Sequence, residues 1–120
     1  MKKEVGVWLD HRQAVLVINL DQEEEIKRIS SDLDDGGATD DDTTANHRKN
    51  NQLNKFYDEV IVAVQDATSI LILGPGEAKV ELQKRLEAQL NGTNEPTVTV
   101  KSADKLTEAQ VAAEVRQHFK

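Results

Sequence analysis

The chain has 120 residues and a mass of 13.4 kDa, which suits one domain over residues 1–120 and leaves no room for two ordinary ones. Hydrophobic residues make up 38% of the chain and aromatic residues 3%, so the core must be built from Val, Ile and Leu; the absence of cysteine excludes disulfides, thiolate zinc sites and cysteine nucleophiles. The net charge of −7 is concentrated between Asp21 and Asn46, where ten acidic residues accompany two basic ones, and the rest of the chain is near neutral.

The apolar segments are short. The run over residues 69–73 is far shorter than a membrane span, and the lysines near the N-terminus precede no apolar stretch of the kind found in secretion signals. We therefore expect a soluble cytoplasmic protein without a membrane partner.

Three segments at the start of the chain predict strands joined by tight turns. Residues 5–9, 14–20 and 25–29 are rich in apolar and β-branched side chains, and polar turns separate them at 10–13 and 21–23. The second segment is apolar on both alternating sides, which predicts cover on two faces. The mixed charge of the third suits an edge strand. Together these segments predict an antiparallel meander.

The periodic pattern stops over residues 31–47, where Ser, Asp, Gly, Thr and Asn dominate. Loops of this length are usually functional or disordered, so we expect a flexible acidic loop. Carboxylates of this kind suit calcium or magnesium, but their spacing does not follow the EF-hand pattern. The histidines show no ligand spacing either, and no metal or cofactor is predicted.

Helical spacing dominates the second half of the chain. One apolar stripe predicts a helix and consists of Leu53, Phe56, Tyr57, Val60, Ile61 and Val64. A buried strand over residues 68–73 ends at the turn Gly74-Pro75-Gly76. The next helix carries Ala78, Leu82, Leu86 and Leu90 and ends at Asn91-Gly92. A strand over residues 97–100 follows, and a capping box of Thr107 and Gln110 opens a helix that buries Val111, Val115 and Phe119.

The predicted order of elements is β-β-β-α-β-α-β-α. Right-handed crossovers between parallel strands place helices on the faces of a sheet. A meander followed by such crossovers predicts an α/β fold of the ribonuclease H-like type. Its mixed five-stranded sheet has the strand order 3-2-1-4-5.

Several motifs are similar to those of one family. They are the Gly36-Gly37 loop leading to a helix with Phe56-Tyr57, and the strand 70–73 followed by Gly74-Pro75-Gly76 and Lys79. With this order of elements, the chain resembles the central domain of archaeo-eukaryotic peptide-chain release factors and of Pelota over residues 4–119. Its opening segment, from Gly6 to Arg12, is similar to stand-alone bacterial relatives.

The resemblance implies a role in translation. In release factors a Gly-Gly-Gln tripeptide helps water to attack the peptidyl ester, whereas the matching tripeptide here is Gly36-Gly37-Ala38. The loop around it is acidic where insertion among RNA phosphates needs cations. We therefore expect a non-enzymatic, ribosome-binding or rescue-type module with ribosome or rRNA as partner and without a small-molecule substrate. The candidate RNA contacts are Arg48, Lys49, Lys55 and Lys79.

Two alternatives stay open. A metal-dependent nuclease on the same fold needs converging carboxylates, and the candidates are Asp10, Glu59, Glu77 and Asp104. Asp10 also suits a hairpin turn, where aspartate accepts local backbone hydrogen bonds. The turn Gly74-Pro75-Gly76 resembles an anion cradle but is more often a plain strand-to-helix connection. The second alternative is a self-associating adaptor, a homo-oligomer whose acidic loop binds a basic partner.

Overall fold

The computed structural model describes residues 3–30, 54–89 and 96–119. Three antiparallel strands come first, β1 (Lys3–Leu9), β2 (Gln13–Leu20) and β3 (Glu23–Ser30). Residues 54–64 are helical and lead to β4 (Ser69–Gly74), α2 (Ala78–Gln89), β5 (Thr97–Ser102) and α3 (Glu108–His118). The predicted order of elements is confirmed in these ranges. Leu53, Leu90 and Asn91-Gly92 lie outside the described residues, as does the predicted acidic loop over 31–47.

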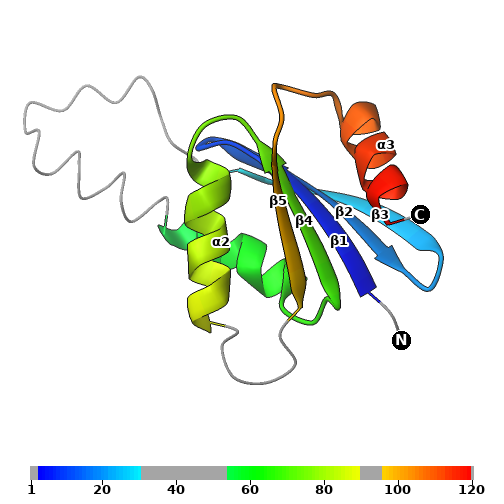
Figure 1. Cartoon of the computed structure of the whole chain (residues 1–120), viewed down its shortest axis with the longest axis horizontal. Coiled ribbons are helices and arrows are strands. Elements are labelled where there is room, and N and C mark those ends of the chain that lie inside the picture. Colours follow the sequence, from blue (N-terminus) through cyan, green and yellow to red (C-terminus); the bar gives the residue numbers. More distant parts are fainter. Residues whose placement is uncertain (1–2, 31–53, 90–95, 120) are drawn as a thin grey trace, which may run out of the picture.

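The five strands form one mixed sheet in the order β3-β2-β1-β4-β5. β1 pairs antiparallel with β2 and parallel with β4, and β4 pairs parallel with β5. The predicted fold class and strand order are therefore confirmed. β1 lies at the centre of the sheet, and β3 and β5 lie at its edges (Figure 1).

Two layers of helices cover the two faces of the sheet. Residues 54–64 and α2 pack on one face, and α3 packs on the other (Figure 1). Alternation along β1 supplies both cores, because Val5, Val7 and Leu9 belong to the first cluster while Trp8 belongs to the second. The burial of β2 residues in both clusters confirms that this strand is covered on two faces.

The apolar stripe predicted for the helix of residues 54–64 is buried wherever the structure describes it. These side chains are Phe56, Tyr57, Val60, Ile61 and Val64. Ala78, Leu82 and Leu86 of α2 join the same cluster. On the opposite face, Val111, Ala112 and Val115 of α3 are buried against Trp8 and Leu71.

The predicted capping box at the start of α3 is present. The backbone N–H of Gln110 donates to Oγ1 of Thr107 at 3.2 Å, and the N–H of Thr107 donates to Oε1 of Gln110 at 2.9 Å. Two arginine–glutamate pairs also hold α3 to β3, Arg28 with Glu108 and Arg116 with Glu24. Helix α3 is therefore fixed at both ends, by its cap and by its contacts with the edge strand.

Candidate functional site

A shallow hollow of about 490 Å³ lies where β1, β2 and β3 meet the connection before α3. Its basic residues are Arg12, Arg28 and Lys105, and its one acidic residue is Asp10. Ser30, the last described residue before the 31–53 segment, also lines it. We call this surface the basic hollow. Its excess of positive charge suits an anionic ligand.

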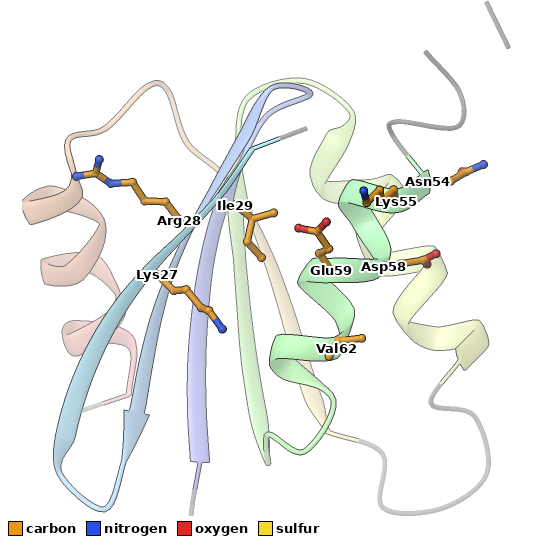
Figure 2. A pocket seen from close by; sticks show the side chains of 8 residues that line it. All are labelled: Lys27, Arg28, Ile29, Asn54, Lys55, Asp58, Glu59 and Val62. Carbon is orange, nitrogen blue, oxygen red and sulfur yellow. The ribbon is translucent and has the colours of Figure 1, made fainter. Parts of the chain in front are cut away.

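A larger groove of about 710 Å³ adjoins the basic hollow and lies between β3 and the helix of residues 54–64. Arg28 and Ile29 line both surfaces. In Figure 2, Lys27, Ile29 and Glu59 point into the space between the strand and the helix, whereas Arg28 points to the side of α3. Asn54, the first described residue after the 31–53 segment, lines this groove as well. The basic hollow therefore includes the described residue before that segment, and the groove includes the described residue after it.

The charges of the groove are mixed. Lys27, Arg28 and Lys55 supply positive charge, while Asp58 and Glu59 supply negative charge. Val62 adds an apolar side chain that is 63% exposed. A polyanion therefore finds a better electrostatic match in the basic hollow than in the groove.

Asp10 acts as a turn residue in this structure. Its Oδ1 accepts hydrogen bonds from the backbone N–H groups of Arg12 at 2.8 Å and Gln13 at 2.9 Å. The backbone N–H of Asp10 donates to the carbonyl of Gln13 at 3.0 Å. These bonds close the β1–β2 hairpin.

The four carboxylates named for a nuclease do not converge. Glu59 lies in the groove, Glu77 precedes α2, and Asp104 follows β5 and accepts a hydrogen bond from Trp8 Nε1 through its backbone carbonyl at 3.0 Å. Across the described ranges, no three His, Asp or Glu side chains form a group that could hold a metal ion. A two-metal centre needs several carboxylates around each ion pair, and the described positions of these four side chains do not bring three of them together.

The turn Gly74-Pro75-Gly76 connects β4 to α2, and its first residue lies close to the backbone of β1. A Cβ on Gly74 would lie 2.2 Å from the carbonyl oxygen of Leu9. Gly76 has a positive φ of 64°, and its carbonyl accepts a hydrogen bond from Nζ of Lys79. The glycines and the lysine thus build the strand-to-helix connection itself.

The remaining sequence candidates are divided between described and undescribed parts of the chain. Lys55 is exposed beside the groove. Gly36, Gly37 and Ala38 lie outside the described residues, as do Arg48 and Lys49. Sequence reasoning missed Arg12 and Lys105, which are far apart in the chain and line the same hollow only in the folded structure.

A polar cluster joins three elements on the helix side of the β1–β2 hairpin. The buried hydroxyl of Tyr57 donates to Oε2 of Glu81, and Nε2 of His11 lies 3.5 Å from the same oxygen. The guanidinium of Arg85 lies 4.8 Å from the centre of the Tyr57 ring. The pKa of Tyr57 is raised well above its usual range, mainly by burial and to a smaller extent by the hydrogen bond to Glu81.

Solved structures show the same arrangement of elements. The Pelota protein of Thermoplasma acidophilum matches 98% of this chain with a TM-score of 0.59 and 16% identity, over 31% of its own length. Pelota of Archaeoglobus fulgidus matches 98% with a TM-score of 0.53 and 14% identity, over 35% of its length. The archaeal translation termination factor aRF1 matches 98% with a TM-score of 0.51 and 13% identity, over 39% of its length.

The chain has a Pelota-like domain fold. It spans about a third of the length of these Pelota and aRF1 structures. No protein-family model and no curated protein sequence matches it. None of the helices in the described part of the chain is long and apolar enough to cross a membrane.

Proposed function

We propose that this chain is a non-enzymatic module that acts in translation by binding the ribosome through rRNA. The observation that carries the proposal is the match of 98% of the chain to domains of Pelota and of a translation termination factor. A cytoplasmic location is part of the same proposal.

The basic hollow is the proposed RNA-binding surface. Arg12 and Lys105 are exposed there, and arginine and lysine side chains neutralise the phosphates of nucleic acids. Arg28 adds positive charge, although its pairing with Glu108 offsets part of that charge. Lys55 extends the surface along the neighbouring helix. Arg48 and Lys49, which lie outside the described residues, are proposed as further RNA contacts.

Lys79 has a smaller part in this proposal. Its ammonium group donates to the carbonyl of Gly76, so it first stabilises the turn before α2. An ammonium has three donors, which leaves room for a further contact. We therefore rank Lys79 below Lys55 as an RNA contact.

The module is proposed to lack peptide-release activity. Ala38 offers a methyl group at the position where the release-factor tripeptide has glutamine. A methyl group forms no side-chain hydrogen bond to a water or an ester. Three aspartates at 40–42 would also oppose insertion among RNA phosphates.

The deciding experiment is cosedimentation with ribosomes from the protein's own host over a series of salt concentrations. We expect salt-sensitive binding, since released counterions drive phosphate contacts. Arg12→Glu and Lys105→Glu should each weaken binding and reduce the salt slope by about one. Lys84→Glu makes the same charge change as Lys105→Glu at an exposed position on α2 and should leave binding unchanged. Absent or salt-insensitive binding would contradict the proposal.

A release assay tests the non-hydrolytic part separately. The unmodified chain should release no peptide from peptidyl-tRNA on programmed ribosomes. Ala38→Gln should not restore release, because the acidic residues of the segment remain. Peptide release by the unmodified chain would contradict this part alone and leave ribosome binding standing.

A further inference from the structure

The outer edge of β3 is open in the described structure. β3 pairs with β2 over eight residue pairs, from Gln13↔Ser30 to Leu20↔Glu23, and no other described strand pairs with it. Every residue of β3 except Ile29 is exposed. An open strand edge is a template for another strand.

The turn before β3 determines which backbone groups point outward. Asp21 and Gln22 have φ values of 51° and 71°, as in the two-residue turns that favour β-hairpins. Such a turn makes Leu20 and Glu23 a hydrogen-bonded pair. By alternation, the N–H and C=O groups of Glu24, Ile26 and Arg28 then face the open edge.

The sequence of β3 is complementary to its own reverse. It begins with three glutamates and continues as Ile26-Lys27-Arg28. If two copies align antiparallel with Ile26 opposite Ile26, Glu25 lies opposite Lys27 and Glu24 opposite Arg28. This register also brings outward-facing backbone groups together, as an antiparallel ladder requires.

We propose that a second copy of this chain pairs its β3 antiparallel to this one, with the two Ile26 residues opposite each other. The product is a twofold dimer with one continuous sheet across both copies. This interface lies on the open edge of the sheet and does not depend on ribosome binding.

The side chains on both faces of β3 support this register. On the α3 side, the Arg116–Glu24 and Arg28–Glu108 pairs of the two copies would form rows of alternating charge. On the other side, Glu25 and Lys27 have no ion pair with any described residue, and each would gain one. Ile26 is 43% exposed and would be covered by its equivalent. Opposite charges across a strand pair are favourable, and like charges are unfavourable.

The other interpretation is that these charges keep the edge unpaired. Charged side chains on an edge strand often prevent association. Protection of that kind does not depend on the order of the charges, whereas the proposed dimer requires acidic residues before Ile26 and basic residues after it. A charge exchange therefore separates the two interpretations.

The test is sedimentation equilibrium of the full chain over a range of concentrations. The wild-type mass should rise from 13.4 kDa toward twice that value. Glu25→Lys and Lys27→Glu should each abolish the rise, because like charges then face each other. The double variant Glu25→Lys/Lys27→Glu should restore it. Lys101→Glu, an exposed change on the opposite edge strand β5, should leave the dimer unchanged.

A second variant tests the backbone contact. Ile26→Pro removes an N–H that faces outward, so the β2–β3 ladder keeps its hydrogen bonds. We expect a monomer whose circular dichroism matches that of the wild type. A wild-type chain that stays monomeric at every concentration would overturn the proposal. So would single reversals that leave the dimer intact, or a double variant that stays monomeric.

Discussion

Gly6 of β1 and Val115 of α3 are in such close contact that a Cβ on Gly6 would lie 2.0 Å from Cγ2 of Val115. The valine therefore occupies the space that any larger residue at position 6 would need. Helix α3 lies close to the centre of the sheet at this point, and Trp8 and Leu71 belong to the same cluster.

Gly6→Ala should destabilise the fold by about 1–3 kcal/mol, as overpacking usually does. Val115→Ala should also destabilise it, because it leaves a cavity. The double variant should lose less stability than the sum of the two, since the shorter side chain makes room for the added methyl group. Urea denaturation followed by the fluorescence of Trp8 measures all three. If the stability losses of the two single variants simply add in the double variant, the contact between Gly6 and Val115 does not determine the cost of the added methyl group.

The single tyrosine of the chain gives a second prediction. Burial and the hydrogen bond to Glu81 raise the pKa of Tyr57 in the folded state. The stabilisation that this shift provides is fully present below the pKa of about 10 that tyrosine has in the unfolded chain. It declines as the pH rises above that value, because the tyrosine ionises more readily in the unfolded chain. Phenolate absorbance should therefore appear together with the loss of helical circular dichroism.

Tyr57→Phe is the control for this titration. It should abolish the absorbance change and reduce the alkaline loss of stability. Phenolate absorbance that appears near pH 10 in a fully folded chain would mean that Tyr57 is accessible to solvent.

Asp10 provides a test of the nuclease alternative. Asp10→Ala removes the acceptor of two backbone hydrogen bonds and should cost about 0.5–2 kcal/mol, as the loss of a comparable cap does. Asp10→Asn keeps an oxygen acceptor and should cost less. Magnesium or manganese should change neither the melting temperature nor the integrity of added nucleic acid. A metal ion that bound the folded state would raise the melting temperature, so binding would be visible in this measurement. Metal-dependent cleavage that Asp10→Asn abolishes would reverse this assignment.

The ion pairs between β3 and α3 predict that the stability of the fold decreases at acid pH. Arg116 lowers the pKa of Glu24, and Arg28 lowers the pKa of Glu108, in each case mainly through a side-chain hydrogen bond. Their stabilisation is present above the unfolded carboxyl pKa of about 4.3 and is lost as the pH falls through the lower folded value.

Glu24→Gln measures one of these pairs. At neutral pH it should lower stability by at most about 1 kcal/mol, because the pair is at the surface. The difference from wild type should shrink in strong acid and in high salt. A constant difference in melting temperature across pH would assign the effect to packing.

Local patterns predicted most of the fold because the decisive information lies close together in the sequence. The stripe from Phe56 to Val64 and the capping box of Thr107 and Gln110 each depend on spacings of three or four residues. The strand order followed from the sequence of elements and the handedness of crossovers. Strand ends were less accurate: β4 covers Ser69–Gly74 instead of 68–73, because ladder pairing determines where a strand ends.

The candidate site was harder to predict because long-range contacts create it. Arg12 and Lys105 are brought together by the β1–β2 hairpin and the connection after β5, and no short spacing relates them. Tyr57 was predicted only as a core residue, since its stripe contains no information about Glu81. For Asp10, the turn interpretation was recoverable from the sequence because its partners are two and three residues away.

The central position of β1 also determines when the two cores can form during synthesis. β1 can pair with β2, and β2 with β3, as soon as that meander has been made, because these contacts are local. Its parallel partner β4 comes only after residue 68, and α3 comes after β5. Until α3 has been synthesised, Trp8, Val15 and Val17 have no helix to cover them. A nascent chain arrested before α3 would therefore present an apolar sheet face, which is the kind of surface that aggregates or recruits chaperones.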